Sequence, residues 1–102
     1  MKIKQGCRVG GIKPEMIIAT LLIEPVLNDY GQELVITEGT GGKHSATSRH
    51  YSGNALDVRI WKLSEDGTVD ECADKLRTAL GAEYRVIVHD THLHIMFIGL
   101  AV

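Results

Sequence analysis

The C-terminal part of the chain constrains the fold most strongly. Residues 84–98 read YRVIVHDTHLHIMFI, and β-branched and other apolar residues are frequent on both sides of Asp90 and Thr91. Two β-rich runs with a short polar break between them are typical of antiparallel strands joined by a tight turn. We therefore expect this segment to form two paired strands.

Upstream of this pair, the sequence predicts one long helix and two more strands. Pro14 is well placed as the first residue of a helix, and an apolar stripe continues from there towards Gly31 as a stop. Pro25 should kink or divide this helix, because proline has no amide hydrogen to donate. The runs 33–39 (ELVITEG) and 54–61 (NALDVRIW) then predict two short strands.

A second helix is predicted between the two pairs of strands. Thr68 and Glu71 form a capping box at its start, and Gly81 ends it. Its apolar face is made of Val69, Cys72, Ala73, Leu76 and Leu80. The order helix, strand, loop (39–49), strand, helix, strand, strand predicts an α+β domain with a small, mainly antiparallel sheet and helices packed on one face.

Size and charge limit what the chain can do. At 102 residues, the chain predicts one domain over 1–102. A formal net charge of -2 supplies no basic surface for nucleic acid, so no nucleic-acid partner is expected. No apolar run approaches the about 18 residues of a membrane span, and the N-terminus MKIKQGCRVGG lacks the apolar core of a signal peptide. We therefore expect no membrane partner and cytoplasmic synthesis without an export route of its own. The oligomeric state is not determined by the sequence, and a monomer is favoured.

The two cysteines do not form a disulfide framework or a zinc ribbon, because they are too few and lack paired spacing. Cys72 falls on the apolar face of the second helix, which favours a small buried hydrophobic side chain. Cys7 lies in a Gly-rich leader, where a free thiol is the default and a place near a functional site stays open.

Histidines and an aspartate occur in two groups that suit a metal site. The turn signal 52–54 separates His50 from Asp57, so the chain can fold back and bring the two side chains together. His92 and His94 are two residues apart on a predicted strand, so their side chains leave the same face. Imidazole and carboxylate suit zinc, and a catalytic zinc takes three protein ligands and a water. Such a water has its pKa lowered to about 7 and supplies hydroxide at neutral pH.

Each group also has a simpler interpretation. A His-x-His on a strand can be a partly exposed pair, and His50 with Asp57 can be a hydrogen-bonded structural pair. The glycines at 39, 41 and 42 are a weak signal for a phosphate-binding loop, because no Walker-type Lys-Ser/Thr follows them.

A family resemblance favours the metal. The stretch SRHYSGNALD, residues 48–57, resembles the Ser-x-His-x-x-Gly-x-Ala-x-Asp signature of the zinc D-alanyl-D-alanine carboxypeptidase family, and HLH at 92–94 is similar to its C-terminal His-x-His. That family includes vancomycin-resistance dipeptidases, carboxypeptidases and phage endolysins that cut peptidoglycan peptides, and the signalling domain of hedgehog proteins. The resemblance covers residues 35–60 and 84–98, and it implies a hedgehog/D-Ala-D-Ala-peptidase-like fold.

The resemblance also implies individual roles. The signature His and Asp and the second His of the last motif bind zinc in this family, which implies His50, Asp57 and His94 as ligands. Ser48 would hydrogen-bond one of these ligands and so help to hold it in place. His44 corresponds to a neighbouring histidine of the hedgehog domain and could donate to an oxyanion; the alternative is an exposed loop histidine.

The chain departs from the family at the general base. Dipeptidase-type members have Glu-x-x-His, but Thr91 stands three positions before His94. The substitutes are His92, as transition-state stabiliser or proton shuttle, and Asp90, as candidate base. A turn-forming aspartate is an equal interpretation of Asp90.

Recognition of a substrate carboxylate is also changed. Many family enzymes hold a substrate carboxylate with an arginine that lies within a Ser-Gly-Tyr-Arg-like run. The corresponding run here reads TEGTGG and contains no arginine. Arg49 and Arg8 are possible replacements, although nothing in the sequence places either one. His89 alternates with the ligands and is expected to be structural or exposed.

The leading hypothesis is a zinc metallopeptidase that hydrolyses peptidoglycan stem peptides containing D-amino acids, as carboxypeptidase or endopeptidase, with a zinc-bound water as nucleophile. The lack of a signal peptide fits a phage or prophage product that reaches the cell wall by phage-type release or within a virion. The alternative is a non-catalytic, zinc-stabilised binding or structural module, such as a virion component. Its hedgehog-specific form is less attractive. The hedgehog domain has a cluster of acidic calcium ligands, and only Glu38 of that cluster remains in this sequence.

Overall fold

A computed structural model describes residues 1–42 and 48–99 of the chain. It contains, in chain order, β1 (Lys2–Ile3), α1 (Pro14–Asp29), β2 (Val35–Glu38), β3 (Ala55–Arg59), α2 (Trp61–Asp66), α3 (Val69–Leu80), β4 (Tyr84–Val88) and β5 (His92–Phe97). The strands form one sheet in the order β1-β2-β3-β5-β4, in which only the β1–β2 pair is parallel. The predicted α+β class with a mainly antiparallel sheet is therefore confirmed.

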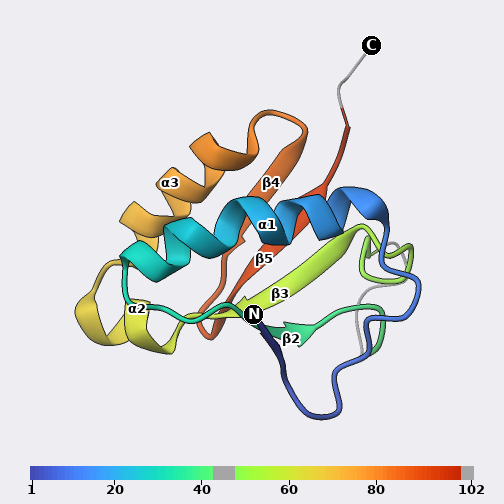
Figure 1. The fold of residues 1–102 in the computed structure, drawn as a ribbon, viewed down its shortest axis with the longest axis horizontal. Helices are drawn as coiled ribbons and strands as arrows, with labels where there is room; N and C mark the ends of the chain where they lie inside the picture. The colour runs from blue at the N-terminus through green and yellow to red at the C-terminus, as the bar shows by residue number, and fades with distance from the viewer. Residues whose placement is uncertain (43–47, 100–102) are drawn as a thin grey trace.

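The hydrophobic core lies between one face of this sheet and the helices α1 and α3 (Figure 1). Alternate residues of the central strands point into it, because side chains alternate between the two faces of a strand. On the inner face these are Leu56 and Val58 of β3 and Leu93 and Ile95 of β5, all at most 1% exposed. The residues between them, which include Asp57 and the histidines of β5, therefore lie on the face away from the helices.

The first helix agrees with its predicted ends. Pro14 is its first residue, and Gly31, with φ +75°, follows its C-terminus. The amide of Gln32 donates back to the carbonyl of Leu27 at 3.0 Å, which satisfies one of the last free carbonyls. The sequence predicted a kink or a division of this helix at Pro25. The helix is not divided there but continues through Pro25 to Asp29.

The strand predicted over 54–61 is wrong at its C-terminal end. The strand stops at Arg59, Ile60 adopts φ −127° and ψ 18°, and Trp61 begins α2. Burial explains the change, since Ile60 and Leu63 are 3% and 0% exposed and only a helical turn points both into the core. Gly67, left-handed at φ +68°, ends this short helix.

The capping box predicted at Thr68 is also wrong. Thr68 precedes α3, but its side chain makes no capping hydrogen bond to that helix. Its amide and its hydroxyl instead donate to the carbonyl of Leu63, at 2.9 and 3.5 Å. The amide and hydroxyl of Thr68 are therefore used in the turn that closes α2 and do not form the predicted capping box of α3.

The C-terminal hairpin is confirmed, with the amide of His89 donating to the carbonyl of His92 at 2.9 Å across the turn. The short parallel strand β1 was not predicted.

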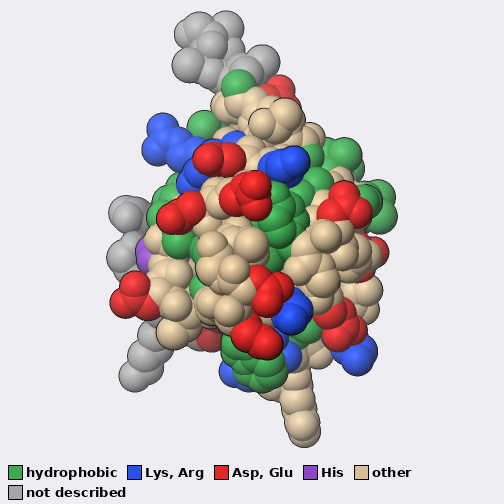
Figure 2. Space-filling model, turned by 90° about the vertical axis from the view of Figure 1, so that its left-hand side faces the viewer, with side chains coloured by type: hydrophobic (Ala, Val, Ile, Leu, Met, Phe, Trp, Pro, Cys, Tyr) green, Lys and Arg blue, Asp and Glu red, His purple; other side chains and the backbone are tan. Residues whose placement is uncertain are grey.

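Figure 2 views the end of the molecule that carries α2 and α3, where acidic and basic side chains are mixed. Each of these helices has an internal ion pair, Lys62–Asp66 in α2 and Arg77–Asp74 in α3. Among the described residues, no helix is long and apolar enough to cross a membrane.

Candidate metal centre

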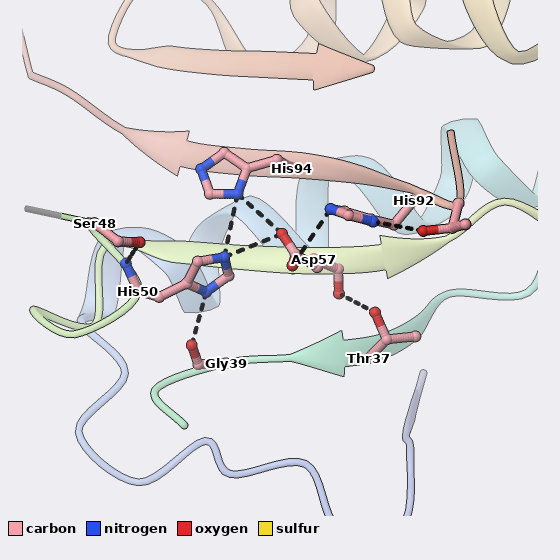
Figure 3. Close-up of polar contacts among 8 residues, drawn as sticks. Thr37, Gly39, Ser48, His50, Asp57, His92 and His94 are labelled. Carbon is pink, nitrogen blue, oxygen red and sulfur yellow. Dashed lines mark hydrogen bonds and ion pairs between the residues drawn. The ribbon is translucent and has the colours of Figure 1, made fainter. Parts of the chain in front are cut away.

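The pairing of β3 with β5 brings together two of the three expected ligands. Asp57 lies opposite His94 in the register, and two residue pairs further along, on the same face, Arg59 lies opposite His92. The carboxylate oxygen Oδ1 of Asp57 is 2.9 Å from Nδ1 of His94 (Figure 3). Because both strands are central in the sheet, this pair has a rigid support.

His50 reaches the same point from the segment before β3. Its Nε2 atom lies 3.1 Å from Asp57 Oδ1 and 3.1 Å from His94 Nδ1. Ser48 supports it through the backbone, since its hydroxyl oxygen accepts a hydrogen bond from the amide of His50 at 3.2 Å. The expected partnership of Ser48 with a ligand is therefore present, but it holds the main chain and not the imidazole ring.

A glycine makes the return of the chain possible. Gly53 has φ +79°, and a Cβ atom at this position would overlap the carbonyl oxygen of Gly11. The carbonyl of Gly53 in turn accepts a hydrogen bond from the amide of Lys13 at 3.0 Å. The turn between His50 and Asp57 is thus packed against the segment that leads into α1.

The three side chains could hold a metal ion. The ligand atoms of His50, Asp57 and His94 all lie within 4.8 Å of one another. Tetrahedral zinc, with bonds of about 2.0–2.2 Å, separates its ligand atoms by about 3.3 Å. The contacts of 2.9–3.1 Å are only slightly shorter than this, so small side-chain movements would suffice.

The hydrogen bonds of His50 are compatible with a cation at this point. Nδ1 of His50 lies 2.7 Å from the carbonyl oxygen of Gly39, so it carries the hydrogen. In neutral His50 the Nε2 atom then has only a lone pair, yet it faces the carboxylate of Asp57. Without a metal ion, Nδ1 of His94 can donate to this lone pair and to Asp57, or His50 can take up an extra proton. A metal ion would bind the lone pair and the carboxylate together. A carbonyl behind the ring is the usual partner of a metal-binding histidine.

The pKa values describe the proton alternative. Burial by itself would raise the pKa of Asp57, but the hydrogen bonds from His50 and His94 and the charge of the histidines hold it well below its usual range. Burial would lower the pKa of His50, but the hydrogen bond to Asp57 and the charge of that carboxylate raise it overall. Without metal, Asp57 is therefore ionised and His50 takes up a proton readily.

His92 stands beside the ligands without joining them. Its Nε2 atom is 3.5 Å from Oδ2 of Asp57, the oxygen that faces away from His50. Its other nitrogen, Nδ1, is 3.0 Å from the hydroxyl of Thr91. Burial lowers the pKa of His92, with Asp57 opposing the effect, so the ring is neutral at pH 7.

A pocket of about 820 Å³ opens over this cluster, and His50, Asp57 and His94 all line it. His50 and Asp57 are buried, whereas His94 is partly exposed. The cluster is therefore reached from the side of the sheet that carries no helix.

The other candidates differ in their relation to the pocket. Arg49 lines it and donates to the carbonyl of Phe97 at 3.4 Å. Asp90 is exposed in the turn between β4 and β5 and is not among the described residues that line the pocket. Arg8 lines a neighbouring pocket of about 420 Å³. His44 lies outside the described residues.

The cysteines and His89 are not part of the His50–Asp57–His94 cluster. Cys72 is buried in the core, as expected, and burial raises its pKa to about 11. Cys7 is a free thiol in the neighbouring pocket, and burial raises its pKa, with Glu38 adding to the effect. His89 is exposed and stacks on His92 with 4.8 Å between ring centres.

Arg59 and Trp61 are among the pocket residues that were missed from the sequence. Arg59 and Trp61 both line the pocket, and the guanidinium of Arg59 lies 3.6 Å from the centre of the indole ring. The spacing of Arg59 two residues after Asp57 on a strand was a signal for a shared face. Trp61 could not be placed in this way, because it begins a helix that was not predicted.

Comparison of the chain with protein-family models, with curated proteins and with solved structures gives no match.

Proposed function

We propose that this chain is a zinc-dependent peptidase that cuts peptidoglycan stem peptides containing D-amino acids. The observation that carries the proposal is the convergence of His50, Asp57 and His94 at the floor of an open pocket. The same three residues are the ligands implied by the resemblance to the zinc D-alanyl-D-alanine carboxypeptidase family.

Zinc is the metal that suits this donor set. Two imidazole nitrogens and one carboxylate oxygen are typical of catalytic zinc, whereas calcium and magnesium prefer oxygen ligands alone. Three protein ligands also leave a fourth tetrahedral position, which in catalytic sites is open to water or substrate.

The ligand residues and His92 would have separate tasks. Bound zinc lowers the pKa of a coordinated water to about 7 and polarises a substrate carbonyl. His50 is held in one tautomer by the carbonyl of Gly39, and Asp57 and His94 are held by the sheet. His92, neutral and facing the pocket, can donate a hydrogen bond to a substrate oxygen or accept a proton.

The pocket has a suitable size for a short peptide, since ligand sites commonly measure about 300–1,000 Å³. The assignment to peptides of the bacterial cell wall rests on the family resemblance. Release by a phage or presence in a virion belongs to the same proposal.

A second function deserves a test because of one observation, the position of Asp90. With Thr91 at the place of the family glutamate and Asp90 outside the pocket lining, no carboxylate of the turn faces the cluster. A zinc-stabilised binding or structural module would need no such base.

The deciding experiment measures zinc content and peptide release on the same samples. Purified peptidoglycan is digested with the zinc-loaded protein, and the products are identified by mass spectrometry. The peptidase proposal expects bound zinc and defined peptide fragments, both lost in Asp57→Asn. Bound zinc without fragments would favour the structural module instead.

Two further variants separate the candidates for proton transfer. His92→Gln should keep its zinc but lose about 10²–10⁴-fold in rate, the usual range for a general acid–base group. Asp90→Asn should change the rate much less. Asp29→Asn, an exposed carboxylate at the end of α1, controls for the effect of the substitution itself.

A further inference from the structure

One arginine on the pocket wall has no acidic partner among the described residues. Arg59 is half-buried on β3, two residues after the ligand Asp57 and on the same face. Within the described part of the chain, it makes no ion pair or side-chain hydrogen bond, and its contact is with the ring of Trp61. Its guanidinium hydrogens are therefore available to a ligand in the pocket.

Stacking on Trp61 fixes this guanidinium in place. The guanidinium carbon lies 3.6 Å from the centre of the indole ring, well within the range of a cation–π contact. A guanidinium that stacks by its flat face keeps its N–H donors in the plane, where they can bind both oxygens of a carboxylate. The side chain of Trp61 is 67% exposed, so little of its surface packs against the protein and its contact with Arg59 is a main one.

The charges around the pocket favour an anionic group at Arg59. The other described cations on the wall are Lys4 and Arg49, and the described acids are Glu38 and Asp57. The carboxylate of Asp57 faces His50, His92 and His94, so it does not neutralise Arg59.

We propose that Arg59, held over Trp61, binds the free C-terminal carboxylate of the peptide substrate. This inference rests on the proposed peptidase function and makes the protein a carboxypeptidase. Two residues along a strand span about 7 Å, which is also the length of about two residues of an extended peptide. The cleaved bond would therefore lie one or two residues before the C-terminus of the substrate.

The single tryptophan of the chain gives a direct test. A tripeptide ending in D-alanyl-D-alanine is titrated as the free acid and as the C-terminal amide, with metal-free and with zinc-loaded protein. Trp61 fluorescence reports binding to the wild type, and calorimetry gives the affinities of variants with altered indole surroundings. We expect the free acid to bind at least about 10-fold more tightly than the amide, because charge-assisted hydrogen bonds are lost with the amide.

Variants assign the preference to Arg59. Arg59→Met should abolish the difference between acid and amide, and Arg59→Lys should keep part of it. Arg85→Met removes an exposed arginine of β4 that does not line the pocket and should keep the full preference. Equal affinities of wild type for acid and amide, no response to either, or an equal loss in Arg85→Met would overturn the inference.

Cleavage of the same peptides, followed by mass spectrometry, separates this inference from the function on which it rests. Cleavage of acid and amide alike, without a binding preference, would refute the role of Arg59 and leave the peptidase. A binding preference that depends on Arg59, without cleavage of either peptide by the zinc-loaded protein, would refute the peptidase and leave a carboxylate-binding site.

Discussion

Asp57 and His94 lie directly opposite each other on the paired strands β3 and β5, with Oδ1 of the one 2.9 Å from Nδ1 of the other. His50 joins this pair from a segment without regular structure. Two ligands thus have their geometry set by the sheet, and the third depends on a turn.

Removal of the Asp57 carboxylate should remove most of the metal affinity. Asp57→Asn keeps the shape of the side chain but loses its charge and contacts with two imidazoles. Loss of a residue behind a ligand commonly costs about 10–100-fold in affinity, so loss of a ligand should exceed about 100-fold. Competition with a zinc-binding dye measures it, with Asp29→Asn as control. Unchanged affinity in Asp57→Asn would place the zinc elsewhere.

Zinc should stabilise the fold as well as the site. Its three ligands join the segment before β3 to the sheet, and an unfolded chain offers no such arrangement. At free zinc about 100 times its Kd, the gain is about 2.7 kcal/mol, which for a domain of this size raises Tm by about 10–20 °C. Differential scanning calorimetry with zinc and with a chelator measures the shift. A similar shift in His94→Ala would argue against this site as the cause.

The metal-free protein should be most stable at mildly acidic pH. The folded pKa of Asp57 is lowered, so its contribution is present above the unfolded value of about 4 and is lost as pH falls below that value. The folded pKa of His50 is raised, so its contribution is present below about 6.5 and is lost as pH rises through the folded value. Both contributions are present together between about pH 4 and 6.5.

Urea unfolding of the metal-free protein across pH 3–8 tests this window. Asp57→Asn should flatten the profile on both sides, because it removes the titrating carboxylate and the partner of His50. A wild-type profile without a maximum in the window would contradict the proposed coupling.

Gly53 should be far less replaceable than another glycine of similar backbone conformation. Gly53 and Gly67 have φ values of +79° and +68°, so alanine is strained at both, by about 1 kcal/mol or more. Only at Gly53 would the new Cβ also overlap backbone, the carbonyl of Gly11. We expect Gly53→Ala to lower the free energy of unfolding by at least about 2 kcal/mol more than Gly67→Ala. Chemical denaturation measures the difference, and equal losses would mean that the turn can move away from Gly11.

The sequence predicted the strongly patterned elements well. The β-rich runs on both sides of Asp90 and Thr91 predicted β4 and β5, and Pro14 and Gly31 bounded α1. In each case, the signal is local, because it depends on the conformational preferences and side-chain periodicity of adjacent residues.

Predictions failed where contacts distant in sequence decided the structure. Ile60 and Leu63 are buried in the hydrophobic core, and this burial converts the end of a predicted strand into α2. Thr68 has the sequence of a cap, but the turn that closes α2 occupies its hydrogen bonds. Local preference contributes less than about 1 kcal/mol at such positions, so burial of apolar side chains overrides it.

The site divides in the same way. By itself, the sequence determined which residue types could bind a metal, since His50, Asp57 and His94 were named from spacing and resemblance. Tertiary structure alone decided that their ligand atoms converge, because the register of β3 on β5 joins positions 37 residues apart. It also put Arg59 on Trp61 at the pocket wall and left Asp90 outside the pocket lining. A residue's chemistry is fixed by its identity, but distances to residues far along the chain are fixed only when the core packs and the strands pair.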